Sequence, residues 1–173
     1  EDTVRTQPRD AMAHYNLGVA LMDAGRPPAE TMPHFEAALA LDPDYARAYM
    51  YLADTYVVDI WLGLADADAS QKSLLLSRKG AGLDNSDVYI QDQLGFAFLC
   101  EGLWEDAEAQ FDQTLSRIVN EAESMAWCGY GFLLLGQPQK ALEILQRAMQ
   151  LDPLHPPALD WILGQVYFFC GRY

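Results

Sequence analysis

Basic residues are scarce in this sequence. It contains 11 Lys and Arg against 25 Asp and Glu, which gives the 173-residue chain a formal net charge of −14 at pH 7. A protein that binds nucleic acid through the phosphates needs a basic face, because Lys and Arg neutralise the backbone charge. The composition therefore argues against nucleic acid as a partner. It is compatible with a basic peptide partner, although an acidic surface also serves simply to keep a protein soluble.

Cysteine and long apolar runs are scarce as well. The three cysteines are Cys100, Cys128 and Cys170, and they form no C-x-x-C motif. An odd number of cysteines without the spacing of a disulfide framework favours a reducing compartment, so we expect a cytoplasmic location. No apolar run reaches the roughly 18 residues that a membrane-spanning helix requires. We therefore expect no membrane span.

Motifs that carry catalytic chemistry are missing. The sequence has no G-x-S-x-G, H-E-x-x-H, P-loop or G-x-G-x-x-G pattern. His14, His34 and His155 each stand alone in the sequence. A lone histidine on a helix is more often exposed or hydrogen-bonded than catalytic. We expect no catalytic residues, no cofactor and no enzymatic activity.

One short string has the spacing of calcium ligands. Residues 66–70, Asp-Ala-Asp-Ala-Ser, place oxygen atoms at positions one, three and five of an EF-hand loop. The Gly and Glu that such a loop requires at positions six and twelve are replaced by Gln71 and Ser77. We expect no metal site, and predict instead that Asp68 or Ser70 caps the helix that follows.

The stretch of residues 88–119 is typical of two amphipathic helices joined by a tight turn at residues 101–103. Gly102 stands where the first helix must stop, because glycine adopts the left-handed conformation without a Cβ clash. Gly95 and Ala107 are small where the two helices would cross. The apolar residues recur at helical spacing in both halves, first at Leu94, Phe98 and Leu99 and then at Trp104, Ala107, Phe111 and Leu115. One such hairpin cannot bury its own apolar face, so it needs neighbours.

The same pattern recurs along the chain. The Leu-Gly pair of this stretch, Leu94-Gly95, has counterparts at Leu17-Gly18, Leu52-Ala53, Cys128-Gly129 and Leu163-Gly164. The pattern resembles the tetratricopeptide repeat, in which W-x2-L-G-x2-Y, A-x3-F and P follow one another within about 34 residues. The resemblance implies an all-α fold, a right-handed superhelical solenoid of antiparallel helix hairpins. It also implies that Cys128, at the place of a repeat Leu, packs as a small hydrophobic residue.

We expect residues 1–173 to form a single array of such repeats. The expected units are repeat 1 at 11–43, repeat 2 at 46–85 with an insertion near 61–69, repeat 3 at 88–119, repeat 4 at 122–153 and a partial repeat 5 at 156–173. The sequence opens without Met and ends half-way through a repeat, so we expect a piece of a longer or processed protein. The apolar Ile162, Val166 and Phe169 would then lack their partner helix, and we expect self-association through this C-terminal helix.

Two repeats depart from the pattern. In repeat 1, the prolines at 27, 28 and 33 cannot all lie inside a helix, so we expect the second helix to run from about Pro33 to Leu41. In repeat 2, we expect helices at 46–62 and at about 68–81. The insertion between them either lengthens both helices or protrudes as a loop. Its apolar residues Trp61, Leu62 and Leu64 either take part in binding or cap the neighbouring hairpin.

In the tetratricopeptide repeat family, the first helix of each hairpin lines the concave surface. Family members that bind an acidic C-terminal tail use a clamp of Lys and Asn, and this chain has Tyr15 and Val19 at those places, so such a ligand is not expected. The groove positions that the resemblance implies, counted from each Leu-Gly pair, are Tyr15, Val19, Arg47, Met50, Asp54, Tyr89, Asp92, Phe96, Glu123, Tyr130 and Trp161.

This groove is apolar, aromatic and mildly acidic. Our hypothesis is a protein–protein interaction scaffold that holds a peptide or helix segment with apolar or aromatic anchors and some Lys or Arg. The alternative is the repeat portion of a larger multidomain enzyme, which positions a substrate or packs on its own chain. Both remain open at the level of sequence, because the fold does not name the partner.

Overall fold

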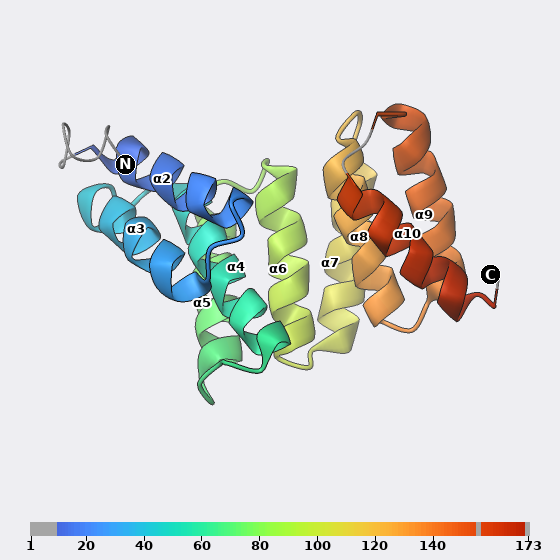
Figure 1. Cartoon of the computed structure of the whole chain (residues 1–173), viewed down its shortest axis with the longest axis horizontal. Coiled ribbons are helices and arrows are strands. Elements are labelled where there is room, and N and C mark those ends of the chain that lie inside the picture. The colour runs from blue at the N-terminus through green and yellow to red at the C-terminus, as the bar shows by residue number, and fades with distance from the viewer. Residues whose placement is uncertain (1–9, 155–156, 172–173) are drawn as a thin grey trace.

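The computed structural model describes residues 10–154 and 157–171, with the side chains of 157 and 158 left out (Figure 1). Within these ranges the chain forms nine α-helices and no strand. The helices are α2 (Ala11–Asp23), α3 (Pro28–Leu41), α4 (Ala46–Leu62), α5 (Ala69–Leu83), α6 (Val88–Cys100), α7 (Trp104–Arg117), α8 (Ala122–Leu134), α9 (Pro138–Leu151) and α10 (Pro157–Phe169).

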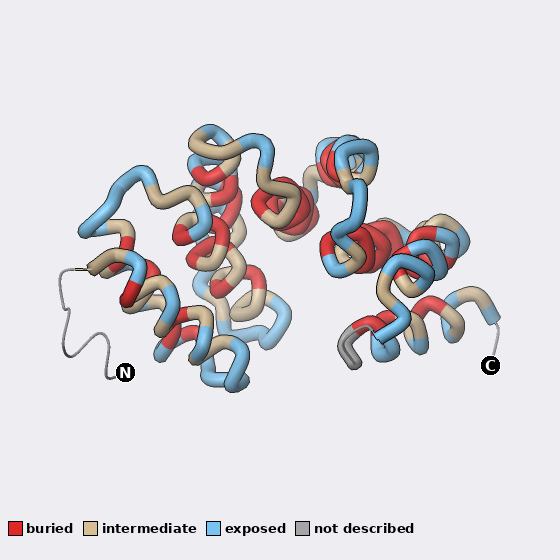
Figure 2. The backbone as a smooth tube through the Cα atoms, turned by 90° about the horizontal axis from the view of Figure 1, so that it is seen from above, coloured by how far each residue is buried: buried red, intermediate tan, exposed pale blue. Residues whose placement is uncertain are grey.

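Successive helices pair as antiparallel hairpins. The pairs are α2 with α3, α4 with α5, α6 with α7 and α8 with α9, and α10 packs on α9 and α8. Each hairpin lies beside the next in chain order, and the first helices α4, α6 and α8 contact one another in turn. Buried stretches occur on helices along the whole row, and exposed residues concentrate on the connections (Figure 2). The all-α solenoid expected from the sequence is confirmed.

The hairpin of α6 and α7 shows how the sequence sets a turn. Gly102 has φ 76° and donates its amide hydrogen to the carbonyl of Leu99 at 3.0 Å, and the Leu103 amide donates to the Phe98 carbonyl at 2.9 Å. These bonds satisfy carbonyls that the end of a helix leaves without partners. The turn predicted at residues 101–103 is confirmed.

The glycine before this turn accommodates an aromatic ring. A Cβ placed on Gly95 would lie 2.5 Å from Cε1 of Phe111, and one placed on Gly131 would lie 2.4 Å from its Cε2. The fully buried Phe111 therefore lies between α6 and α8. Phe35 takes the same position against Gly18 in the first hairpin, at 2.6 Å. Gly95 and Gly18 thus each leave room for a ring from the second helix of their own hairpin, and Gly131 leaves room for the ring of the preceding hairpin.

The expected start of α3 near Pro33 is wrong. The helix begins at Pro28, after Pro27 in an extended conformation with φ −65° and ψ 153°. Proline is well suited to the first helical position, because an amide hydrogen there has no partner within the helix. Pro28 is the first residue of α3, and Pro33 lies in its interior on the exposed side.

The insertion in the second repeat both lengthens a helix and adds a loop. Helix α4 ends at Leu62 as expected and has 17 residues, against 13 in α2 and α6. A connection of residues 63–68 follows, and α5 then runs to Leu83, two residues beyond its expected end at Ala81. Asp68 occupies the N-cap position without a capping bond, and its carboxylate pairs with Lys72 at 3.0 Å. Asp68, one of the two predicted caps, therefore takes the N-cap position but does not make the predicted capping bond.

The C-terminal helix is better covered than expected. Ile162 and Val166 are fully buried, because α10 packs on α8 and α9 and joins their core. The expectation that they lack partners is wrong. Phe169, 63% exposed, remains without such cover. The parts of the expected fifth repeat at 156 and at 172–173 lie outside the described residues, as does His155.

Cys128 lies in the same core. Its side chain is fully buried, and burial raises the pKa of its thiol. The expectation that it packs as a small hydrophobic residue is confirmed.

A candidate binding groove

The first helices of the hairpins enclose a concave cavity of about 490 Å³. Helix α4 contributes the most side chains, α6 and α8 continue the wall, and the end of α2 closes one side. The lining residues are Met22 and Asp23 from α2, Arg47, Met50, Tyr51, Asp54, Val58 and Trp61 from α4, Tyr89, Asp92, Gln93 and Phe96 from α6, and Glu123 and Trp127 from α8. We call this cavity the groove.

The groove brings together most of the residues that the resemblance implied. Those around the cavity are Arg47, Met50, Asp54, Tyr89, Asp92, Phe96 and Glu123. The other four do not line it. Tyr15 packs its ring on Tyr45 and Tyr51, with centroids 4.8 and 5.5 Å apart, and Val19 is partly buried on α2. Tyr130 and Trp161 lie beside each other, 5.7 Å between centroids, where α10 meets α8.

Several lining residues are not at the groove positions counted from the Leu-Gly pairs, so the repeat pattern did not predict them. Trp61 is the most prominent. It lies seven residues after Asp54, on the same face of α4, but in the additional turn that a repeat of ordinary length lacks. Its place in the insertion and its apolar character were the available signals. The face that each helix turns to the groove is wider than the positions counted from the Leu-Gly pairs. Four further lining residues lie on it: Tyr51, Val58, Gln93 and Trp127.

Trp61 joins an aromatic cluster across three hairpins. Its ring meets Phe96 at 5.9 Å and Tyr130 at 6.1 Å, both edge-to-face. Phe96 in turn meets Trp127 at 6.3 Å. Trp61 is 48% exposed, whereas Phe96 and Tyr130 are 4% and 8% exposed. The inserted tryptophan thus packs on the neighbouring hairpins and still presents part of its surface to the groove.

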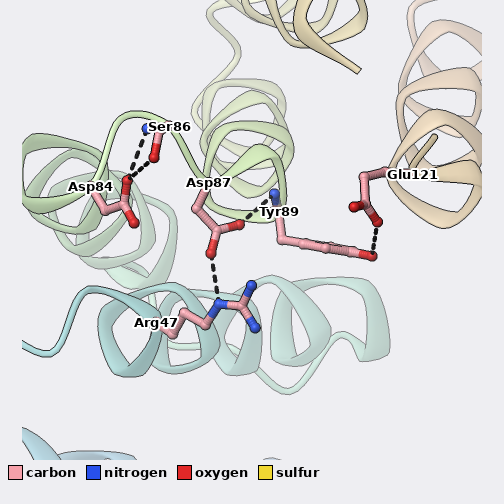
Figure 3. Close-up of polar contacts among 6 residues, drawn as sticks. All are labelled: Arg47, Asp84, Ser86, Asp87, Tyr89 and Glu121. Carbon is pink, nitrogen blue, oxygen red and sulfur yellow. Dashed lines mark hydrogen bonds and ion pairs between the residues drawn. The ribbon is translucent and has the colours of Figure 1, made fainter. Parts of the chain in front are cut away.

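Arg47, the basic side chain among the lining residues, is already paired. Its Nε donates to Oδ2 of Asp87 at 2.6 Å, and its guanidinium lies 5.7 Å from the centre of the Tyr89 ring (Figure 3). Asp87 also accepts from the Tyr89 amide at 3.0 Å and so caps α6. The hydrogen bond to Asp87 raises the pKa of Arg47. The guanidinium of Arg47 is therefore paired with the N-cap residue of α6.

Tyr89 extends this polar chain to the next hairpin. Its hydroxyl donates to Oε2 of Glu121 at 3.1 Å (Figure 3). Burial, together with that carboxylate, raises the pKa of Tyr89 to about 12. Just before α6, Asp84 accepts from both the amide and the hydroxyl of Ser86, at 2.9 and 2.7 Å. Polar contacts thus fix the loop and the first turn of α6 at the edge of the groove.

Two carboxylates, those of Asp54 and Asp92, lie in the interior of the groove. Asp92 is 6% exposed and accepts from the Ser124 hydroxyl at 2.7 Å. Burial raises its pKa well above the usual range, and the nearby Asp54 adds to that shift. Burial also raises the pKa of Asp54 to about 6. The side-chain amide of Gln93, with its nitrogen towards α4, lies 3.2 Å from Oδ1 of Asp54. Asp23 and Glu123 are exposed at the rim.

The part of the chain that the structure describes has neither a cluster of metal ligands nor a membrane-spanning helix. No group of three or more His, Cys, Asp or Glu side chains there could hold a metal ion. No helix there is both long and apolar enough to cross a membrane. A smaller cavity of about 290 Å³ lies between α9 and the end of α10, and is lined by Gln139, Leu142, Glu143, Gln146 and Cys170.

Comparison with known proteins agrees with the repeat pattern. A family profile described as tetratricopeptide repeat matches residues 1–30. No curated protein sequence matches the chain. A thermophilic tetratricopeptide repeat protein of Thermus thermophilus superposes with a TM-score of 0.81 at 19% identity, over 97% of this chain and 87% of that one.

Two further solved structures share the arrangement. PilW, a type IV pilus biogenesis factor, gives a TM-score of 0.70 at 14% identity, over 99% of this chain and 76% of its own. A human IFIT1 dimer with PPP-AAAA gives 0.69 at 22% identity, over 83% of this chain and 32% of its own. At such identities the likeness concerns the fold.

Proposed function

We propose that this tetratricopeptide repeat protein is an interaction scaffold that holds a peptide or helix segment of a protein partner in the groove. The observation that carries the proposal is the cavity of about 490 Å³ formed by the first helices of successive hairpins. Pockets of roughly 300–1,000 Å³ bury drug-sized ligands, so this cavity has room for a few anchoring side chains of a partner segment. Repeat proteins generally use such concave surfaces to bind other proteins.

The walls of the groove offer aromatic surface to a partner. Trp61 is about half exposed, and Trp127 and Tyr89 are partly exposed, so ring surface is accessible from the cavity. Aromatic residues are enriched among the few that contribute most to protein interfaces. Met50 adds an apolar side chain to the same cavity. Apolar and aromatic anchors on a partner segment would fit this surface.

The charge of the groove limits the class of partner. The lining residues include four carboxylates and one guanidinium, that of Arg47, which already pairs with Asp87. The four carboxylates belong to Asp23, Asp54, Asp92 and Glu123. An acidic peptide would be repelled, and so would an RNA such as the PPP-AAAA in the IFIT1 structure. A segment that combines apolar anchors with Lys or Arg matches the groove. In the alternative role, as the repeat portion of a larger multidomain enzyme, a substrate or the same polypeptide would take that place.

A charge reversal at the rim tests the proposal. Peptides that bind the chain are selected from a random display library, and their affinities are measured by calorimetry for the wild type, Glu123→Lys and Glu105→Lys. The two glutamates are both exposed and both lie in the first turn of a helix, but only Glu123 lines the groove. The two variants therefore have the same net charge, and each loses one favourable negative charge at the N-terminus of a helix.

We expect Glu123→Lys to weaken binding about tenfold and Glu105→Lys to change it less than about twofold. A library that gives no binder would contradict the proposal. Binders that are equally affected by both variants would contradict it as well, because they would attach elsewhere on the acidic surface.

A further inference from the structure

Two carboxylates from neighbouring hairpins face the same cavity. Asp54 comes from α4 and Asp92 from α6, and both line the groove. They interact electrostatically, since the charge of Asp54 raises the pKa of Asp92. Asp92 is 6% exposed and is held by the hydroxyl of Ser124. The fold therefore holds a pair of acids in the groove, one of them buried and the other partly buried.

No protein cation lies between these acids among the described lining residues. Arg47, the basic residue of that set, is bound to Asp87 at 2.6 Å. Removing carboxylates from water without a counter-charge is costly, and the raised pKa values of both groups reflect that cost. A cation that enters the cavity would regain this free energy. Charge complementarity thus points to the chemistry of the occupant.

The neighbouring rings suit the same kind of group. Trp61, Trp127 and Phe96 line the cavity with the two acids, and two of these rings are partly exposed. The faces of aromatic rings attract cations, indole most strongly. A guanidinium combines both demands, because it is planar, stacks on rings and donates to two carboxylates through separate N–H groups. An ammonium, more compact and more strongly hydrated, matches this set of groups less well.

We propose that the groove is an arginine-recognition site, in which a guanidinium of the partner segment is bound by Asp54 and Asp92 and packs on Trp61 and Trp127. The inference rests on the proposed function and specifies it. It predicts that one position of a bound peptide must be arginine, whereas the other positions require only apolar or aromatic side chains.

A comparison of arginine with citrulline tests this proposal. Citrulline has nearly the same shape as arginine but carries no charge. The probes are acetylated and amidated nonapeptides from a positional-scanning library, in which each position is fixed in turn as arginine, citrulline, lysine, leucine or glutamate. Affinities are measured by fluorescence anisotropy against the wild type, Asp54→Asn and, as the matched control on α4 outside the groove, Asp59→Asn.

At one position we expect arginine to bind the wild type about tenfold or more tightly than citrulline, and about threefold or more tightly than lysine. The preference over citrulline should largely disappear with Asp54→Asn and persist with Asp59→Asn. The arginine proposal is overturned if peptides bind, lose affinity with Glu123→Lys, and yet show no preference for arginine over citrulline. In that case the groove would still be a binding site. If no peptide shows binding sensitive to Glu123→Lys, the proposed function itself fails.

Discussion

Arg47 and Asp87 join two hairpins at the edge of the groove. The guanidinium of Arg47, on the first turn of α4, donates to the carboxylate that caps α6, over 2.6 Å between Nε and Oδ2. The side chain of Asp87 is 10% exposed and that of Arg47 is 49% exposed. The contact therefore fixes α6 against α4 and leaves the two acids of the groove without that cation.

Breaking this pair should cost little stability when only the arginine is changed. Arg47→Gln is expected to lower the free energy of unfolding by about 0.5–1 kcal/mol, because the pair is partly exposed. Asp87→Ala removes the N-cap of α6 as well, and should cost about 1–2 kcal/mol. Urea denaturation followed by circular dichroism measures both. Equal losses for the two variants would mean that the cap contributes nothing.

Gly95 should tolerate no side chain. Its missing Cβ would lie 2.5 Å from the ring of the fully buried Phe111, so Gly95→Ala is expected to cost about 1–3 kcal/mol, and Gly95→Leu at least as much. Gly82 on α5 is the control, since nothing lies within 4 Å of its Cβ position. Gly82→Ala should be neutral or stabilising by up to about 1 kcal/mol. Thermal and urea unfolding compare the two, and a Gly95→Ala variant as stable as the wild type would contradict the packing described.

The stability of the protein should fall as the pH rises through the titration of Asp54. Its folded-state pKa of about 6 lies above the ordinary value near 4, so the folded state binds more protons than the unfolded state between these limits. The free energy of unfolding should therefore decrease from about pH 4 to pH 6, by roughly 2–3 kcal/mol from this group. Asp54→Asn should be more stable than the wild type near pH 8, and Asp59→Asn should not. Urea titrations at several pH values give the answer, and an unchanged curve for Asp54→Asn would contradict the assigned burial.

Binding of an arginine peptide should show the opposite pH dependence. Ionised carboxylates attract the guanidinium, so affinity should rise from pH 5 to about pH 7.5, and protons should be released near pH 6. The charged and titratable groups that line the groove are Asp23 from α2, Arg47, Tyr51 and Asp54 from α4, Tyr89 and Asp92 from α6, and Glu123 from α8. Two more interact electrostatically with its acids from outside the lining: Asp87, at the N-cap of α6, with Asp92, and Cys100, at the end of α6, with Asp54. Calorimetry in buffers of different ionisation enthalpy measures the number of protons released when the peptide binds. Affinity that is constant over this range would speak against recognition by Asp54 and Asp92.

Self-association is expected at the C-terminal helix. On α10, Trp161, Phe168 and Phe169 are 58%, 65% and 63% exposed. A paired change of Phe168 and Phe169 to Ser should abolish concentration-dependent association in sedimentation velocity. Trp104→Ser, at an equally exposed tryptophan on α7, should leave it unchanged. Association that survives the α10 change would place the contact elsewhere.

The repeat pattern predicted the fold because it records contacts within each hairpin. Gly95, Gly102 and Phe111 lie close in sequence and determine one turn and one crossing, so their spacing alone predicts both. The start of α3 at Pro28 was missed for a local reason. Three prolines are compatible with one helix when one precedes it, one begins it and one lies on its exposed side.

The groove was harder to predict, because its members depend on contacts between hairpins. Trp61 enters it through an additional turn of α4 that no repeat position describes. Trp161 is at a groove position by count, but it packs beside Tyr130 where α10 turns onto α8. Phe96 is almost fully buried, so replacing it with Ala would test packing more than binding. The exposed lining residues are therefore the better targets for mutation.

The four tryptophans allow the most direct test of the groove itself. Trp61 and Trp127 line it, whereas Trp104 on α7 and Trp161 on α10 do not. In protein labelled with ¹⁵N at the indole nitrogens, a library-selected peptide is titrated in and the four indole signals are followed by NMR. We expect the signals of Trp61 and Trp127 to shift together with the binding curve, while that of Trp104 stays in place. Saturable binding that shifts Trp104 or Trp161 and leaves Trp61 and Trp127 unchanged would contradict this expectation.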